Sequence, residues 1–226
     1  MYMAKQNVNE KEALRRENIE ETVSKTDQFY NEHKKTIWTV VCILAVVALA
    51  VFAYVKLIYQ PKCAEAMQQA FPAEQNFANG EYELALNGDG NVLGLAEIIS
   101  EYGAKAGKAV YMEAGVSALQ LGQFEDALNY LKKYNGKEPI LAARAISAQG
   151  DAYVGLERYQ EAASAYLRAA AKSDDDFAAG YLLKAGIIFE QLGQKAKAVE
   201  CYKTVKDKYP NSLEAYDIDK YISRAE

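Results

Sequence analysis

The eight-residue stretch "LGQFEDAL" at 121–128 recurs with changes as "LERYQEAA" at 156–163 and "LGQKAKAV" at 192–199. The leucines that open these stretches are 35 and 36 residues apart. Small residues keep the same steps, namely Gly115, Gly150 and Gly186 before each stretch and Ala127, Ala162 and Ala198 within it. A fixed period of this length is typical of helical hairpins that stack into a solenoid. The repeat therefore predicts an all-α fold.

Each residue type in the repeat has a physical reason. Glycine and alanine suit positions where two helix backbones approach closely, and the leucine and aromatic positions fill the space between hairpins. Gly122 and Gly193 follow the opening leucine, where a glycine tolerates the left-handed conformation that ends a helix. Pro139 and Pro210 close the first and third copies, since proline does not continue a helix. We interpret the repeated stretch as a packing code that carries no chemistry of its own.

The three copies together resemble the tetratricopeptide repeat, in which glycine, leucine-glycine, aromatic, alanine, aromatic and proline positions follow one another at fixed spacing. The residues that carry the resemblance are Gly115, Leu121, Gly122, Phe124, Ala127, Leu131 and Pro139 in copy one, Gly150, Tyr153, Leu156, Tyr159, Ala162 and Tyr166 in copy two, and Gly186, Phe189, Leu192, Gly193, Ala198, Tyr202 and Pro210 in copy three. The resemblance implies antiparallel helix pairs whose first helices line a concave surface that binds peptides.

A second feature is the stretch "TIWTVVCILAVVALAVFAYV" at 36–55, which holds 20 residues without a charge. At about 1.5 Å per helical residue it spans about 30 Å, the thickness of a bilayer core. Trp38 stands near one end and Tyr54 and Tyr59 near the other, where aromatic rings favour the membrane interface. We predict a transmembrane helix rather than a cleaved signal peptide, because a predominantly polar segment of 35 residues precedes it.

The charges beside this span predict its orientation. The 20 residues before it hold the basic residues Arg16, Lys25, Lys34 and Lys35, and those that follow it closely are Lys56 and Lys62. An excess of basic residues marks the cytoplasmic side of a span. We therefore expect a single-pass protein of the bacterial inner membrane, with its N-terminus in the cytoplasm and its repeats in the periplasm.

Five segments follow from these features: a charged cytoplasmic lead helix at 1–35, the transmembrane helix at 36–59, a diverged first helical hairpin with its connection at 60–107, three tetratricopeptide repeats at 108–210, and a C-terminal capping helix at 211–226. The lead helix is either a docking element or a solvated approach to the membrane. In the diverged hairpin we expect helices over 62–79 and from about Leu93 to Tyr102. In the cap we expect Leu213, Tyr216 and Ile222 to face the solenoid.

The sequence offers no catalytic or metal-binding constellation. The single histidine, His33, lies before the span, so a histidine-based triad or zinc site is excluded for the repeats. The three cysteines have no metal-binding spacing; Cys201 is expected in the core, with a Cys63–Cys201 disulfide as the alternative. The acidic run Asp174–Asp176 suits the start of a helix. We expect no enzyme activity and no cofactor.

We expect the partners to be proteins or peptides. The formal net charge of −5 gives no sign of a nucleic-acid partner. Helical spacing on the first helix of each repeat predicts a peptide-binding concave face made of Met112, Val116, Leu119, Gln120, Arg144, Ser147, Asp151, Val154, Leu183, Ile187 and Glu190. Replacing Arg144, Asp151 and Glu190 with alanine is then expected to weaken association without loss of stability. The competing interpretation is that some of the apolar residues pack against neighbouring helices.

The layout of the whole chain resembles the YfgM-type ancillary subunits of the bacterial Sec translocon. The residues "QFYNEHKKTIW" at 28–38 lead into the span, and a diverged hairpin follows it directly. The resemblance implies an inner-membrane protein that contacts translocon subunits, meets secreted clients as they emerge, and passes them to periplasmic chaperones. The alternative is a structural scaffold for an assembly of the cell envelope, in the outer membrane or the cell wall.

Overall fold

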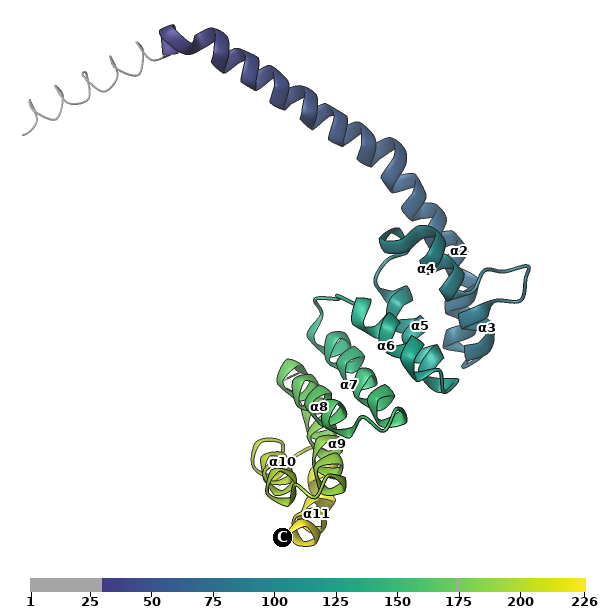
Figure 1. Ribbon diagram of the computed structural model, residues 1–226, viewed down its shortest axis with the longest axis vertical. Helices are drawn as coiled ribbons and strands as arrows, with labels where there is room; N and C mark the ends of the chain where they lie inside the picture. Colours follow the sequence, from purple (N-terminus) through teal and green to yellow (C-terminus); the bar gives the residue numbers. More distant parts are fainter. Residues whose placement is uncertain (1–29, 174) are drawn as a thin grey trace, which may run out of the picture. The chain divides into compact units, whose positions relative to one another are not determined.

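The protein, represented by a computed structural model, is described over residues 30–173 and 175–226 (Figure 1). Helices dominate these residues, and no extended strand occurs among them. The chain divides between Tyr59 and Gln60 into two compact units, Met1–Tyr59 and Gln60–Glu226. The prediction of an all-α fold is confirmed.

The first unit is helical wherever it is described. Residues 30–54 form an α-helix, and η1, a π-helical turn, covers Val55–Tyr59. The helical run Tyr30–Ala78 contains an 18-residue window with a mean hydropathy of 2.7, none of which is buried by protein. By length and composition this run is able to cross a membrane. A signal sequence meets the same criteria. Most of the predicted lead helix at 1–35 lies outside the described residues.

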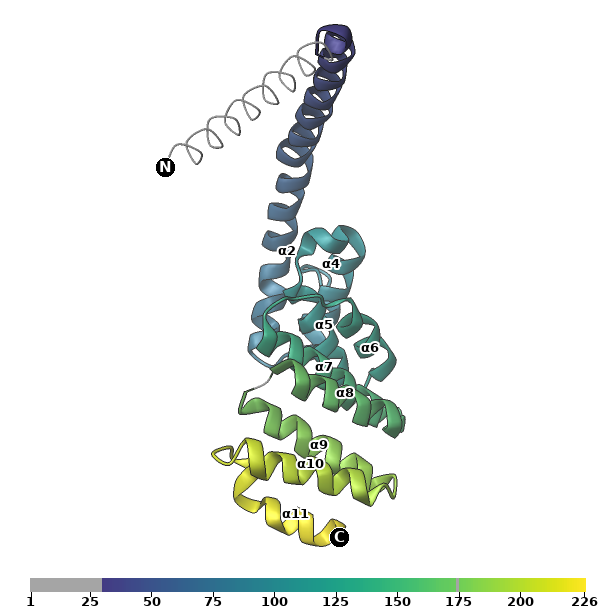
Figure 2. The same ribbon diagram turned by 90° about the vertical axis from the view of Figure 1, so that its left-hand side faces the viewer.

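The second unit is a succession of helix pairs. Its helices are α2 (Gln60–Ala78), α3 (Tyr82–Asn87), α4 (Leu95–Tyr102), η2 (Gly103–Ala106), α5 (Ala109–Gln120), α6 (Phe124–Lys133), α7 (Pro139–Gly155), α8 (Tyr159–Ser173), α9 (Phe177–Gln191), α10 (Lys195–Lys208), η3 (Glu214–Asp217) and α11 (Ile218–Ala225). The pairs α5/α6, α7/α8 and α9/α10 coincide with the three repeat copies. From α5 onward each helix packs chiefly against its neighbours in sequence, which is the contact pattern of a solenoid (Figure 2).

Inside each hairpin, a glycine of the first helix lies against a large side chain of the second. A Cβ atom added to Gly115 would lie 2.6 Å from Leu131 Cγ, and one added to Gly150 would lie 2.5 Å from Tyr166 Cε1. The same atom on Gly186 would lie 2.3 Å from Tyr202 Cε1. Because carbon atoms do not approach this closely, a larger residue would separate the two helices. The recurring glycines are therefore close-approach positions, as the sequence predicts.

The repeated stretch builds the turn between the two helices of each pair. The same backbone hydrogen bond closes all three turns, from Gln123 N to Ala118 O, from Arg158 N to Tyr153 O and from Gln194 N to Phe189 O, each at 2.8 Å. It leaves one residue with a positive φ, which is Gly122 (73°), Glu157 (58°) or Gly193 (70°). Copy two thus places a glutamate in a conformation that favours glycine.

The N-terminal hairpin differs from the repeats in its lengths. Its leading helix α2 begins two residues before the predicted 62–79, and α4 begins two residues after the predicted Leu93. The second helix of the pair, α3, has only six residues. The "NGDGN" turn that follows is closed by Asp89 Oδ1, which accepts hydrogen bonds from Asn91 N (2.9 Å) and Val92 N (2.8 Å).

The C-terminal cap corrects one expectation. Leu213 and Tyr216 were predicted to face the solenoid, but each is 92% exposed. The chain forms the 3-10 turn η3 here, and residues three apart in such a turn lie on the same side. The α-helical cap starts only at Ile218, so Ile218, Ile222 and Ala225 provide the buried face. The α-helical cap therefore begins seven residues after the predicted start at 211.

One helix start differs from the sequence interpretation, and a second agrees with it. Pro139 opens α7 instead of ending α6, which stops at Lys133, and Glu138 accepts a hydrogen bond from Leu141 N at 2.7 Å. In the acidic run before α9, Asp175 accepts the hydrogen bond from Phe177 N at 3.1 Å. The Asp175 carboxylate therefore caps the start of α9, as the sequence predicts, whereas the Asp176 side chain makes no capping hydrogen bond.

The close approach at Gly150 yields a stability prediction. We expect Gly150→Ala to lower the free energy of unfolding by about 1–3 kcal/mol, because the added methyl group overpacks against Tyr166. The matched control is Gly180→Ala in α9, where the nearest atom is Oε1 of the flexible Glu214 side chain at 3.1 Å. The control is expected to be neutral or to stabilise by up to about 1 kcal/mol through helix propensity. Urea unfolding measures both; equal losses would contradict the packing role of Gly150.

The turn of copy two yields a second prediction. Glu157→Gly is expected to raise the free energy of unfolding by about 1 kcal/mol, since it relieves the left-handed strain of a non-glycine residue. Glu157→Ala removes the same carboxylate but keeps the strain, so its melting temperature should stay close to that of the native protein. If alanine stabilises as much as glycine, the side chain and not the backbone is responsible.

Candidate binding site

The predicted concave-face residues divide into three groups by environment. Met112, Val116, Leu119, Val154 and Leu183 are half-buried and pack against the core. Gln120, Arg144 and Ile187 are exposed. The polar residues Ser147, Asp151 and Glu190 form a third group, whose environments differ most from the expectation.

Ser147 is only 4% exposed, so its inclusion in the predicted binding surface was wrong. It lies on α7, the central first helix of the solenoid, which packs against α5, α6 and α8. A residue in that position is enclosed from more than one side, and helical spacing alone does not reveal this.

Asp151 joins two neighbouring hairpins. Its Oδ1 accepts a hydrogen bond from the Tyr166 hydroxyl at 2.7 Å and pairs with Lys184 Nζ at 2.8 Å. Tyr166 belongs to the same hairpin, whereas Lys184 is on α9 of the next one. Burial, together with the Asp151 carboxylate, raises the pKa of the Tyr166 hydroxyl, which therefore stays protonated as a donor.

Glu190 repeats this arrangement one hairpin later. The Tyr202 hydroxyl donates to Glu190 Oε1 at 2.6 Å, and Arg224 of α11 donates from Nε and Nη2, each at 2.9 Å. The bidentate contact with Arg224, followed by the Tyr202 hydroxyl, holds the pKa of Glu190 below its usual value. Asp151 thus tethers one helix pair to the next, and Glu190 tethers the last pair to the capping helix α11. Their replacement by alanine is now expected to reduce stability, contrary to the expectation from sequence.

A groove of about 580 Å³ lies beside α9 and contains one predicted residue, Leu183. Its other lining residues come from the start of α9 with its N-cap and from the turn that leads into η3: Asp176, Phe177, Gly180, Tyr181, Lys184, Asn211, Ser212, Leu213 and Glu214. Two of its lining side chains are large, apolar and exposed, namely Phe177 (51%) and Leu213 (92%). We name this the α9 groove.

Arg144 connects the α9 groove to the predicted concave face. Its guanidinium carbon lies 5.5 Å from the centre of the Phe177 ring, a cation–π contact between α7 and α9. Burial raises the pKa of the neighbouring Tyr181 hydroxyl, and the positive charge of Arg144 partly opposes that shift. The groove thus combines two aromatic rings, aliphatic side chains and charges of both signs.

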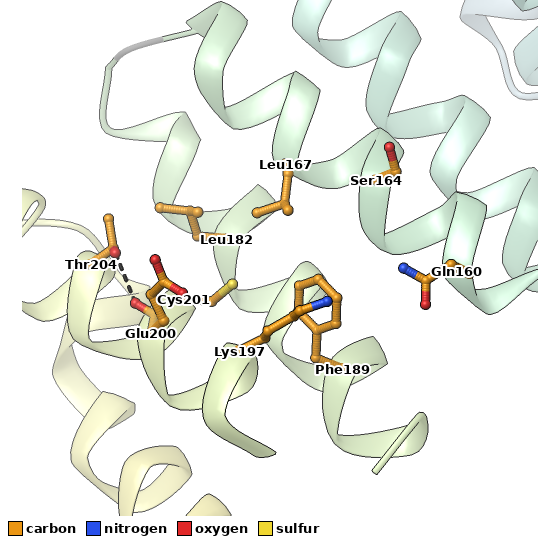
Figure 3. A pocket seen from close by; sticks show the side chains of 9 residues that line it. All are labelled: Gln160, Ser164, Leu167, Leu182, Phe189, Lys197, Glu200, Cys201 and Thr204. Atoms are coloured by element: carbon orange, nitrogen blue, oxygen red, sulfur yellow. Dashed lines mark hydrogen bonds between the residues drawn. The ribbon is translucent and has the colours of Figure 1, made fainter. Parts of the chain in front are cut away.

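A second groove, of about 460 Å³, opens between α8 and α10, the second helices of two hairpins (Figure 3). Leu167, Leu182 and Phe189 form its apolar part, with Lys197 Nζ 5.3 Å from the Phe189 ring centre. Burial raises the pKa of the Cys201 thiol in this groove to about 11, so the thiol is not activated as a nucleophile. Cys201 is buried as predicted, and all three cysteines are free.

Sequence reasoning missed most of the α9 groove. Phe177, Tyr181 and Lys184 follow one another at i, i+4 and i+7, one position away from the stripe that was chosen on the same helix. One signal was present in the sequence. Apolar residues occur around more of the circumference of α9 than packing within a single hairpin requires. Leu213 was identified but was assigned to the core.

The described residues hold no group of three or more histidine, cysteine, aspartate or glutamate side chains placed to bind a metal ion.

Comparisons with known proteins agree with this architecture. Residues 147–212 match the tetratricopeptide repeat family. The fold is a tetratricopeptide-type solenoid. The crystal structure of MamA protein is similar, with a TM-score of 0.51 and 19% sequence identity over 73% of this chain and 86% of that chain. None of the curated proteins matches the chain. Tetratricopeptide repeats act as protein-interaction scaffolds, so the solenoid is assigned that general role.

The tether at Glu190 generates a prediction. We expect Glu190→Ala to lower the free energy of unfolding by about 1–3 kcal/mol, because the Tyr202 hydroxyl loses its acceptor in a part-buried site. As control, Asp219→Ala breaks an exposed pair with Lys206 and is expected to cost less than about 1 kcal/mol. Chemical denaturation measures the free energy of unfolding of both variants. Equal losses would contradict the role of Glu190 as a tether.

Proposed function

We propose that the protein is a single-pass inner-membrane protein whose periplasmic solenoid binds unfolded segments of secreted chains next to the Sec translocon and passes them to periplasmic chaperones. The apolar helix 30–54 supports the anchor, and the predominance of basic residues before it supports the orientation. The whole-chain layout supports the translocon as the place of action.

The observation that carries the binding role is the α9 groove. Phe177 and Leu213 line it with exposed apolar side chains, although burial of such groups is favourable at about 25 cal/mol per Å². Asp176, Glu214 and the amide of Asn211 place polar groups beside them. A surface of this kind suits an extended chain with alternating apolar and polar residues, which is the composition of an unfolded client.

Successive hairpins extend the same surface. Arg144 reaches Phe177 from α7, and Ile187 is exposed one helical turn after Leu183 on α9. An extended segment bound to the α9 groove therefore meets the predicted concave face. The client is expected to lie across α7 and α9, with its end at the turn that contains Leu213.

A pair of variants tests this function. Leu213→Ser is expected to weaken binding of an unfolded secreted chain by about tenfold, since Leu213 lines the groove and supplies apolar contact. Tyr216→Ser is the matched control, because Tyr216 is also 92% exposed but does not line the groove. Fluorescence anisotropy of a labelled client against the full-length protein in detergent measures both affinities. Equal weakening by the two variants, or none by either, would contradict the groove as the binding site.

A further inference from the structure

Glu214 rests against the backbone of α9 inside the α9 groove. A Cβ atom added to Gly180 would lie 3.1 Å from Glu214 Oε1 and 3.8 Å from Glu214 Cδ. Phe177, Gly180 and Lys184 follow one another at i, i+3 and i+7, so they share one face of α9, and all three line the groove. Because Gly180 has no side chain, the carboxyl group of Glu214 lies between the positions of Phe177 and Lys184 along the helix.

The two cations beside the groove are held by other groups. Lys184 Nζ pairs with Asp151 Oδ1 at 2.8 Å, and the guanidinium carbon of Arg144 lies 5.5 Å from the centre of the Phe177 ring. Neither cation forms an ion pair with Glu214, and no other described residue supplies this carboxylate with a salt bridge. Glu214 therefore keeps a charge that a bound chain is able to neutralise.

A second carboxylate gives the groove more charge of the same sign. Asp176 lines the groove at the start of α9, and its side chain makes no hydrogen bond that caps the helix. Of the described residues that line the groove, Lys184 alone is basic, and Asp151 already matches its charge. The uncompensated charge of the groove is therefore negative. The formal net charge of the chain, −5, has the same sign.

The surroundings of Glu214 favour a cation that carries an apolar stem. Leu213 and Phe177 are exposed apolar residues of the same groove, and Tyr181 adds a second ring. Glu214 is half-buried, and partial removal from water strengthens its attraction for an opposite charge. Lysine and arginine side chains lay their aliphatic stems on apolar surface while their head groups reach a charge. The groove therefore suits a basic side chain better than a neutral or an acidic one.

We propose that Glu214 determines which segments the α9 groove selects. Its carboxylate accepts hydrogen bonds from the ammonium or guanidinium group of a lysine or arginine in the bound segment, and the apolar neighbours of that residue contact Phe177 and Leu213. This inference rests on the proposed function, because it specifies the class of segment that the groove receives. Acidic segments are disfavoured, since Asp176 and Glu214 repel them. The preferred client segment thus holds a basic residue between apolar ones.

Three short labelled peptides test this preference on the native full-length protein in detergent. They have blocked ends and alternate leucine with serine, and they differ only in a central lysine, glutamine or glutamate. Fluorescence anisotropy is expected to show that the lysine peptide binds roughly tenfold more tightly than the glutamine peptide, because hydrogen bonds between charged groups are the stronger ones. The glutamate peptide should bind most weakly. The advantage of lysine should shrink as ionic strength rises, since salt screens a partly exposed pair.

Variants of Glu214 assign the preference to this residue. Glu214→Gln keeps the shape of the side chain and removes its charge, so the advantage of the lysine peptide over the glutamine peptide should fall from roughly tenfold to less than about twofold. Glu214→Lys should reverse the order of the lysine and glutamate peptides. The matched control is Asp207→Asn on α10, which removes one negative charge at an exposed residue that does not line the groove. It should keep the advantage of the lysine peptide.

The outcomes separate this inference from the proposed function. If Leu213→Ser weakens binding of all three peptides but the native protein does not favour lysine, the groove binds clients and the role of Glu214 is overturned. A lysine advantage that persists in Glu214→Gln overturns that role as well. If no peptide binds, or if Leu213→Ser leaves every affinity unchanged, the α9 groove is not the binding site, and the proposed function and this inference are both contradicted.

Discussion

The close approach of two helix backbones within each hairpin is the constraint on which the rest of the solenoid depends. Gly115, Gly150 and Gly186 leave no room for a side chain, and the space is taken by Leu131, Tyr166 and Tyr202. This contact sets the distance between the helices of a pair. It also fixes where the next hairpin docks, because the outer faces of the pair are then determined.

The same tyrosines connect packing to polar chemistry. The hydroxyl groups of Tyr166 and Tyr202 reach past the glycines to Asp151 and Glu190, which in turn hold a cation from the following element. The first copy has Leu131 in this place and lacks the hydroxyl. The two tethers therefore lie in the C-terminal half of the solenoid. They fix α9 and α11 beside the groove that we propose as the binding site.

The sequence predicted the repeating part of the fold because the repeat records local contacts. Glycine spacing, the Leu-Gly turns and the buried cysteine in α10 all depend on neighbours within one hairpin or the next. The binding surface was predicted less well. Helical spacing identified a face but did not separate the exposed Arg144 from the enclosed Ser147, and it did not show that Glu190 is held by Arg224, 34 residues later. Leu213 was misplaced because a 3-10 turn changed the side on which it lies.

The central claim is that the α9 groove receives secreted chains while the apolar helix holds the protein at the translocon. In vivo photo-crosslinking tests it most directly, with probes at Tyr181 and Leu213 in the groove, at Leu167 in the second groove as a comparison, and at Tyr59 beside the apolar helix. The account predicts many different secreted chains at Tyr181 and Leu213, few at Leu167, and translocon subunits at Tyr59. A single recurring envelope complex at every position would contradict it and would indicate a dedicated assembly scaffold.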